Sequence, residues 1–524
     1  MQSLDWIVIW TYLAGMLCLA VYLSRKQSSS EDYFLGGHNL SAKTLAASTI
    51  ATQCSTNSLL GAPAFVGFVA GGGMIWLQYE LAVPLAMLAL LWLMLPARRL
   101  GITSIYEILE QRIGRTTRLT AAACFLLFRG VATAVTIYGS ALVIALILDI
   151  GFVSAVALLM IATLLYDYFG GLTAVVISDV VQLALLVGAV IYALFFIGDL
   201  IAWDFSAAER TQTLVNDWGL TGQDYGFWPM LIGGIFLYAA YYGCDQSQAQ
   251  RILAARSESE TAQVLLLNGL CRFPIVLLYC FLGLGLAALA AIDPQIIERL
   301  PETEAGSKNL NLVFPTFVLS YFQPGFVGLI MVGLIAASMS SIDSALNSLS
   351  AVTVEDFIRP RLTDPKPRSL LRLGRLCTVL WGIFAVAFAF QVEQIAPTVL
   401  EAVNKVGSMV NGPLLALVSA AILGRHTSQI TALAGFASGL VANALVAWLL
   451  PDVSWLWWNV IGFVVAITLI GTGHLVLPAA HAELNGSTEI PSAIQHPPRV
   501  YPMVLGAAFC VISTIIWVID IWQP

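Results

Sequence analysis

A stretch of small polar residues between Ala336 and Ser344 carries the side chains best suited to bind a cation. The residues that fall on one helical face, at spacings of three and four, are Ala337, Ser340, Ser341 and Ser344. Serine hydroxyls, supplemented by backbone carbonyls, suit a partly dehydrated sodium ion, a hard cation that needs oxygen ligands. A close-packing face between helices has the same composition, so this pattern alone leaves both interpretations open.

Two apolar segments are interrupted by residues that break helices. The first contains the polar run 52–58, whose side chains compete for backbone hydrogen bonds, followed by Pro63. The second carries Gly233 and Gly234 before the polar run 241–246. Unwound backbone inside a membrane is tolerated where it lines a cavity, and its freed carbonyls and helix ends can hold a cation and a small solute. Packing seams of small residues are the alternative interpretation.

Ionisable residues lie within or at the edges of the apolar segments. An ionised Asp at the centre of a bilayer costs about 2.5–3.5 kcal/mol, so it should face a cavity, an ion or a partner. Asp179 has no basic neighbour in sequence, and Asp343 lies within the serine stripe. The other ionisable residues of this kind are Glu80, Arg129, Asp245, Arg272, Glu401 and Lys405. Some of them are expected to pair with each other for stability.

The elements that position these side chains must be membrane helices. The 524 residues are 59% hydrophobic and 10% charged, which excludes a water-soluble fold, because soluble domains average about 25% charged residues. Apolar runs of about 20 residues recur along the chain, and each is long enough to cross a bilayer as a helix. The sequence predicts an all-α integral membrane protein with about fourteen spans, near 5–24, 43–68, 75–97, 119–148, 152–169, 173–198, 227–250, 262–291, 325–350, 370–391, 396–423, 429–450, 455–477 and 500–521.

The placement of Lys and Arg predicts the orientation in a cell (inner) membrane. With the N-terminus outside, most of the 24 basic residues lie in inner loops, as the positive-inside rule requires. The inner-loop residues are Arg25, Lys26, Lys43, Arg98, Arg99, Arg112, Arg115, Arg118, Arg251, Arg256, Arg359, Arg361, Lys366, Arg368, Arg372, Arg375, Arg425 and Arg499.

The chain is predicted to be a single transmembrane domain over residues 1–524. The two interrupted spans lie five spans apart, and an odd offset inverts topology. The sequence therefore predicts two oppositely oriented repeats, 43–198 and 227–423, with peripheral helices over 429–521. A short cytoplasmic helix is expected over 102–107, with Thr103 or Ser104 as its cap, and a short external helix over 311–322.

Several motifs occur in order along the chain, at 32–37, 170–182, 245–251 and 352–356. With them the chain resembles the sodium/solute symporter family, which includes sodium/glucose, proline, sialic acid and monocarboxylate or iodide transporters. The similarity runs to about residue 425. It implies the 5+5 inverted-repeat core of the leucine transporter, with one helix before that core and three after it.

The resemblance also implies cation sites. The principal sodium site would use the backbone carbonyls of Ala51, Cys54 and Ala337 with the hydroxyls of Ser340 and Ser341. A second cation site would use Asp179, Ser344 and the position of Asp343, where the family has a small hydroxyl. Asp343 could strengthen cation binding, carry a proton or pair with a base such as Lys405, so one or two sodium ions per cycle are both open.

The residues that the resemblance assigns to the substrate are Ser55, Asn57, Ser58, Gln78, Tyr79, Glu80, Asp245, Arg272 and Asn404. The stretches 101–104, 352–356 and 407–415 look closer to the monocarboxylate, vitamin and iodide branch, which indicates an organic anion with Arg129, Arg272 or Lys405 as countercharge. Glu80 and Asp245 favour a zwitterion or polyol equally.

The predicted function is sodium-coupled symport of a small polar solute by alternating access. We expect Na⁺ as the coupling ion, no organic cofactor, no nucleic-acid partner, and a monomer or weak homo-oligomer in the lipid bilayer. Symport of an amino acid, sugar or polyol is the alternative, and a transporter-like membrane sensor is a further class. No catalytic activity is expected, because neither an HExxH nor a GxSxG motif occurs.

Overall fold

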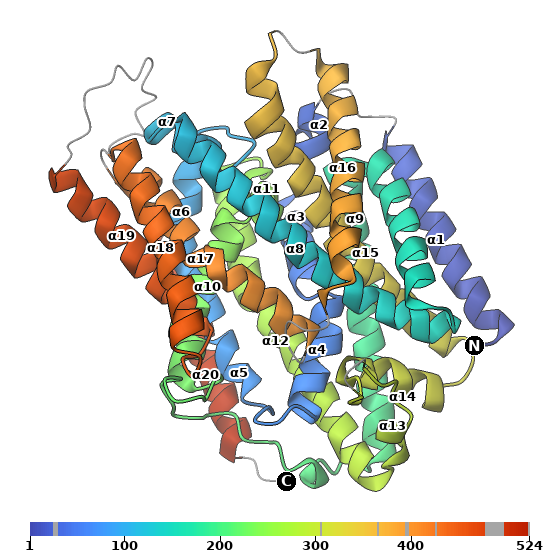
Figure 1. The fold of residues 1–524 in the computed structure, drawn as a ribbon. Coiled ribbons are helices and arrows are strands. Elements are labelled where there is room, and N and C mark those ends of the chain that lie inside the picture. Colours follow the sequence, from blue (N-terminus) through green and yellow to red (C-terminus); the bar gives the residue numbers. More distant parts are fainter. Residues whose placement is uncertain are drawn as a thin grey trace.

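The computed structural model describes residues 1–24, 30–303, 306–363, 366–392, 398–424, 427–476 and 497–521. Helices account for nearly all regular structure in these residues, and an isolated bridge between Glu302 and Lys308 is the exception (Figure 1). Eleven helices of the described chain are long and apolar enough to cross a membrane. The prediction of an all-α, multi-pass membrane protein is therefore confirmed. Arg25, Lys26 and Arg425, which the sequence assigned to inner loops, lie outside the described residues.

The long helices are α1 (Ser3–Ser24), α6 (Ala82–Arg99), α8 (Arg115–Leu148), α9 (Phe152–Leu200), α12 (Glu258–Ile292), α15 (Phe326–Val352), α16 (Pro367–Ala389), α17 (Val399–Leu423), α18 (Gln429–Leu449), α19 (Leu456–Val476) and α20 (Val500–Ile521). The shorter ones are α2 (Ser30–Leu35), α3 (Ala42–Gln53), α4 (Thr56–Gly67), α5 (Trp76–Glu80), α7 (Glu107–Arg112), α10 (Gly234–Cys244), α11 (Gln246–Leu253), α13 (Gln295–Glu298) and α14 (Val313–Tyr321). Single turns include η3 (Pro229–Gly233) and η5 (Thr353–Ile358).

Helix α9 contains a break at Gly171, whose φ of 58° and ψ of −175° are not helical. A residue with a side chain rarely adopts this positive φ, so glycine is needed at this position. The sequence predicted two spans here, 152–169 and 173–198. The break falls between them.

Both predicted interruptions are present. Helix α3 ends at Gln53 and α4 begins at Thr56, with Cys54 and Ser55 between them in non-helical conformations. Helices α10 and α11 are separated by Asp245 alone, which is extended (φ −75°, ψ 117°). Each break therefore lies inside the polar run that predicted it.

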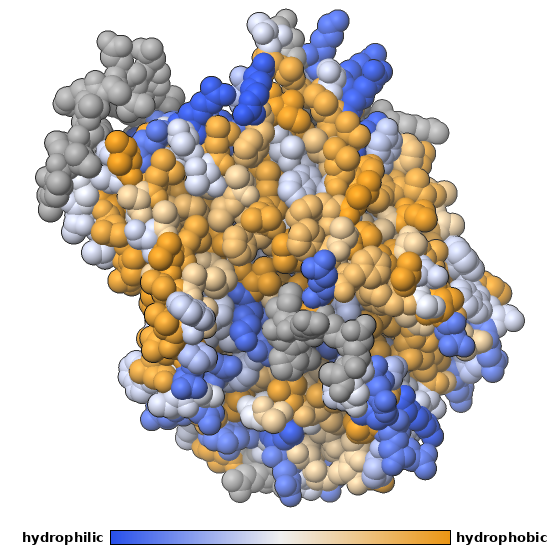
Figure 2. Space-filling model, viewed as in Figure 1, coloured by the Kyte–Doolittle hydropathy of each residue, from blue (hydrophilic) through white to orange (hydrophobic). Residues whose placement is uncertain are grey.

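The two broken helices lie within a bundle of longer ones. Helix α3 packs against α9, α12 and α15, and α15 also contacts α8 and α1. Helix α17 packs against α8, α10 and α4. Outside this bundle, apolar residues cover the middle of the surface in Figure 2 and hydrophilic residues gather towards its two ends, as a bilayer requires.

The short helix expected over 102–107 begins later than predicted. Helix α7 starts at Glu107, and neither Thr103 nor Ser104 caps it. Instead, the Glu107 carboxylate accepts hydrogen bonds from the backbone N–H groups of Thr103 (3.2 Å) and Ser104 (2.9 Å). The Ser104 hydroxyl donates to Asp356 at 2.7 Å, so a tertiary contact replaces the local cap. The second short helix lies at Val313–Tyr321, within the predicted range.

Candidate functional site

The break between α3 and α4 leaves a backbone carbonyl without a donor. The last four carbonyls of a helix have no partner within it. Three of the four accept here: Ile50 from the Cys54 N–H (2.7 Å), Thr52 from the Ser341 hydroxyl (3.3 Å) and Gln53 from the Ser58 hydroxyl (3.0 Å). No described group donates to the carbonyl of Ala51.

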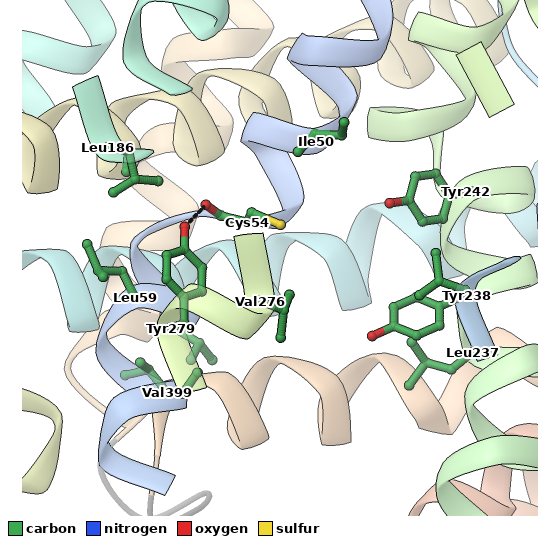
Figure 3. Close-up of a cluster of buried hydrophobic side chains, with 14 of the residues drawn as sticks. Ile50, Cys54, Leu59, Leu186, Leu237, Tyr238, Tyr242, Val276, Tyr279 and Val399 are labelled. Atoms are coloured by element: carbon green, nitrogen blue, oxygen red, sulfur yellow. Dashed lines mark hydrogen bonds between the residues drawn. The ribbon is translucent and has the colours of Figure 1, made fainter. Parts of the chain in front are cut away.

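Helix α12 holds the same break open from the other side. The Tyr279 hydroxyl donates to the Cys54 carbonyl at 2.9 Å (Figure 3). The figure shows these two groups meeting beside Ile50 and Leu59, which belong to the two halves of the broken helix. The carbonyl of Cys54, a predicted sodium ligand, thus has a tyrosine partner.

The predicted serine stripe of α15 faces α3 and α9. Ser341 reaches the Thr52 carbonyl of α3, while the Ser340 hydroxyl donates to a carboxylate oxygen of Asp179. Ser344 donates to the Ser340 carbonyl at 2.6 Å and lies 3.2 Å from the Thr52 hydroxyl. All three serines are buried. Ser341 therefore contacts the broken helix, whereas the Ser340 hydroxyl contacts α9.

Asp179 has a partner that sequence analysis assigned elsewhere. The sequence counted Arg251 among the inner-loop residues, but its side chain is only 1% exposed and lies 3.3 Å from the Asp179 carboxylate. The Arg251 Nε donates to the Ser48 hydroxyl at 2.7 Å, and its Nη2 donates to Ser344. Ser48 in turn donates to Asp179 at 2.5 Å. A guanidinium thus contacts two members of the second predicted cation set, because the whole of α11 is buried.

Asp343, the third member of that set, has no hydrogen-bond partner among the described residues. Neither does Asp167, which sequence analysis overlooked. Both are completely buried. The predicted pairing of Asp343 with Lys405 does not occur, since Lys405 instead lies 3.8 Å from Glu401.

A cavity of about 120 Å³ lies beside the broken helices. The predicted residues that line it are Ser55, Asn57, Ser58, Tyr79, Asp245, Arg272, Asn404 and Ser341. Its other polar residues include Thr52, Gln53, Arg129 and Thr136, and aromatic rings from Trp76, Phe125, Phe128, Tyr238, Tyr241 and Tyr279 complete the wall. Most of the predicted substrate positions are therefore brought together with one predicted sodium ligand.

Two predicted substrate positions do not line this cavity. The Gln78 amide donates to the Tyr225 carbonyl at 2.7 Å and accepts from the Val215 N–H at 3.2 Å, so it fastens the segment between α9 and η3. Glu80 is bound to Arg272 instead. Successive helical residues point about 100° apart, so Gln78, Tyr79 and Glu80 face three different neighbours.

Arg272 and Glu80 form a buried bidentate pair. The Arg272 Nε and Nη2 donate to the two Glu80 oxygens at 2.8 and 3.0 Å, and Nη2 also lies 2.7 Å from the Tyr238 hydroxyl. The guanidinium stacks on the Tyr238 ring, 4.6 Å from its centroid. Two parallel charge-assisted bonds neutralise both groups.

Arg129 is paired more loosely. Its Nη1 lies 3.3 Å from one Asp245 oxygen, while the other oxygen accepts from the N–H (2.8 Å) and hydroxyl (2.6 Å) of Ser247 and so caps α11. The Arg129 Nε has no partner among the described groups. Sequence analysis named Arg129 only as a possible countercharge, yet it lies in the cavity wall opposite the α3–α4 break.

Comparison with known proteins agrees with this architecture. The chain is 27% identical to the sodium/sialic acid symporter of Aliivibrio fischeri, over 92% of this chain and 94% of that protein. It is 30% identical to the mouse sodium-coupled monocarboxylate transporter 1, over 84% and 73%. A solved substrate-bound, outward-open sodium-coupled sialic acid symporter superposes with a TM-score of 0.80, at 25% identity, over 91% of this chain and 99% of that one.

A nucleobase-cation-symport-1 family transporter shares the fold alone, with a TM-score of 0.58 at 12% identity, over 84% of this chain and 94% of that one. The model of the sodium:solute symporter family matches residues 33–479, which is most of the chain. Because this match spans both broken helices and the cavity between them, the chain belongs to the sodium:solute symporter family.

Proposed function

We propose that this chain carries a small organic anion across the membrane together with sodium, by alternating access. The observation that carries the proposal is one cavity that joins three features: the break between α3 and α4, Ser341 of the serine stripe, and the loosely paired Arg129. A cation and an anion bound in one cavity would each reduce the electrostatic cost of burying the other.

The proposed sodium ligands are the carbonyls of Ala51, Cys54 and Ala337 and the hydroxyls of Ser340 and Ser341. The unpartnered Ala51 carbonyl beside Ser341 supports this assignment. The sodium ion would bridge α3 and α15, and so stabilise one arrangement of the two helices. Its binding would therefore raise the affinity for the solute at the adjoining break, and the solute would raise the affinity for sodium equally.

The proposed second cation set, Asp179, Asp343 and Ser344, has an internal competitor. Arg251 contacts both Asp179 and Ser344, so a second cation would have to displace its guanidinium. One sodium ion is sufficient to drive accumulation: inward movement of one charge through 100 mV releases about 2.3 kcal/mol, enough for roughly fortyfold accumulation of a neutral solute. If the solute is a singly charged anion, its transport with one sodium ion moves no net charge, so the sodium concentration gradient alone would drive accumulation.

The proposed solute is a carboxylate that binds Arg129 through its free Nε. The relatives named above transport sialic acid and monocarboxylates, which supports an acid as the solute. Asp245 lies beside Arg129 and could hold an amino group, so a zwitterion is the second candidate. Ser55, Asn57, Ser58, Tyr79 and Asn404 would supply the remaining polar contacts, whereas Gln78 and Glu80 would act through the residues they bind.

The finer architecture is part of the proposal. Helix α9 would cross the membrane twice, with its turn at Gly171, and each broken helix would cross once, which gives fourteen crossings together with the other long helices. Residues 43–198 and 227–423 would form inverted repeats, and 429–521 the peripheral helices. The chain would lie in the inner membrane with its N-terminus outside, as a monomer or weak oligomer without organic cofactor.

The test is uptake by proteoliposomes that contain the purified protein. The double variant S340A/S341A should lose sodium-dependent uptake of its solute, found first by a thermal-shift screen of small carboxylates, amino acids and sugars in sodium and in potassium. S348A is the matched control, because Ser348 lies on the same helix and bonds only to the Ala345 carbonyl. Uptake that keeps its sodium dependence in S340A/S341A would show that the proposed sodium site is wrong.

A further inference from the structure

The start of α16 carries basic side chains that have no partner in the described part of the chain. Lys366, Arg368 and Arg372 are exposed, and none has a hydrogen-bond or ion-pair partner among the described residues. We call these three residues the basic face.

Several basic residues elsewhere on the predicted inner side are engaged, although Lys43, Arg115 and Arg499 also have no side-chain partner among the described residues. Arg99 forms a bidentate pair with Glu258 at 2.5 and 2.6 Å, and Arg118 contacts both Glu110 and Asp356. Arg112 donates to the Ala421 carbonyl at 3.2 Å. What sets the basic face apart is that its three unpaired charges lie close together, within residues 366–372.

The basic face continues directly into an apolar face on the same helix. Arg368 and Arg372 are four residues apart, and Leu376, Leu380 and Ile383 follow at spacings of four, four and three residues. The three apolar side chains are 53%, 54% and 60% exposed. One side of α16 thus presents two positive charges followed by an uncovered apolar strip.

These charges do not serve to stabilise the helix. Cations near a helix N-terminus oppose the macrodipole, and here they occupy the first turns of α16. Lys366, at the N-cap position, makes no side-chain capping bond. The start of α16 therefore favours the approach of negative charge.

We propose that this side of α16 binds an anionic phospholipid of the bilayer. The phosphate lies between Arg368 and Arg372, with Lys366 at its outer side, and an acyl chain runs along Leu376, Leu380 and Ile383. Arg375, less than a turn further along the helix, adds a further positive charge, and its guanidinium lies 5.2 Å from the Tyr168 ring. A polybasic segment at the bilayer surface attracts anionic lipids in this way.

Such a lipid would act on the helix that carries the serine stripe. The Ser350 hydroxyl of α15 donates to the Gly374 carbonyl of α16 at 2.6 Å, and the Trp381 Nε1–H donates to the Thr353 hydroxyl at 2.9 Å. Ordering of the start of α16 would therefore order the adjoining end of α15.

The experiment is a titration of detergent-solubilised protein with short-chain phosphatidylglycerol. The thermal unfolding midpoint of the protein is measured at each lipid concentration. Phosphatidylcholine and inorganic phosphate serve as parallel titrants. We expect a saturable rise of the unfolding midpoint with phosphatidylglycerol only. In R368Q/R372Q the half-saturating lipid concentration should be about thirtyfold higher, because each basic side chain contributes roughly fivefold to the affinity. The control R299Q/K308Q removes two charges from the segment between α12 and α14 and should keep the wild-type response.

Three results would overturn the proposal. The first is an equal response in R368Q/R372Q and the wild type, which would place any lipid elsewhere. The second is an equal loss in both double variants, which would indicate a general effect of net charge. The third is an equal rise with inorganic phosphate, which would indicate a soluble anion in place of a lipid. R368K/R372K, which keeps both charges, should bind at least ten times more tightly than R368Q/R372Q.

Discussion

Arg272 and Arg129 line the same cavity, and each is paired with a carboxylate, but the two pairs differ in how closely the base meets the acid. Arg272 meets Glu80 through two bonds of 2.8 and 3.0 Å and is supported by Tyr238. Arg129 meets Asp245 through one contact of 3.3 Å, and that aspartate is shared with the cap of α11. In the sequence these are four separate charged residues, and nothing there indicates which acid pairs with which base.

The difference separates a structural pair from a binding pair. Arg272 also has one nitrogen, Nη1, without a partner among the described groups, but both Glu80 oxygens already meet its charge, so a carboxylate ligand has less to gain there. A loosely held guanidinium with a free Nε can gain a new charge-assisted bond. We therefore expect changes at Arg272 to act on stability and changes at Arg129 to act on solute binding.

The largest effect is expected from R272A. It removes one partner of a buried pair and leaves the Glu80 carboxylate uncompensated, which should cost about 3–5 kcal/mol of unfolding free energy. The measurement is the thermal unfolding midpoint in detergent. E80Q/R272Q removes both charges and should be less destabilised than R272A, so equal or greater destabilisation of the double variant would contradict the assignment of Arg272 as a structural partner.

R129Q should leave the protein folded and weaken solute binding. A hydrogen bond to a charged group contributes about 1.5–3 kcal/mol, so the half-saturating concentration of a carboxylate solute should rise roughly ten- to hundredfold. Uptake kinetics in proteoliposomes measure this change, with the unfolding midpoint as control for folding. A wild-type half-saturating concentration in R129Q would exclude Arg129 as the anion partner.

D245N should discriminate between the two candidate solutes. The amide oxygen can still accept from the Ser247 N–H, so the cap of α11 is retained, while the charge that competes for Arg129 is removed. A simple carboxylate should then bind about fivefold more tightly, whereas a zwitterion should bind more weakly, for a change of about 1 kcal/mol. Competition assays with a matched pair, such as lactate and alanine, distinguish the outcomes.

The smallest effect is expected from K405Q. Its contact with Glu401 is 3.8 Å long and the lysine side chain is 33% exposed, and such pairs contribute about 0–1 kcal/mol. The unfolding equilibrium constant and the half-saturating solute concentration should each change by less than about fivefold. A larger loss of anion binding would transfer the role of countercharge from Arg129 to Lys405.

The sequence predicted those features that depend on local chemistry. Hydroxyl side chains that compete for backbone carbonyls marked the α3–α4 break, and the polar run that ends in Asp245 marked the second one. Helical spacing predicted that Ser340 and Ser341 share a face. Apolar runs of sufficient length predicted membrane helices, which eleven long helices of the described chain confirm.

The tertiary structure decided which charges meet. Arg251 was assigned to an inner loop because it follows the predicted span 227–250, but the packing of α11 against α3 and α15 buries it beside Asp179. Gln78, Tyr79 and Glu80 were grouped as one binding segment, yet they face a loop carbonyl, the cavity and Arg272 respectively. A helix fixes only the direction in which each side chain points, and the partner of that side chain belongs to another helix far away in sequence. Pairing therefore depends on how helix faces pack against each other and cannot be predicted from spacing along the chain.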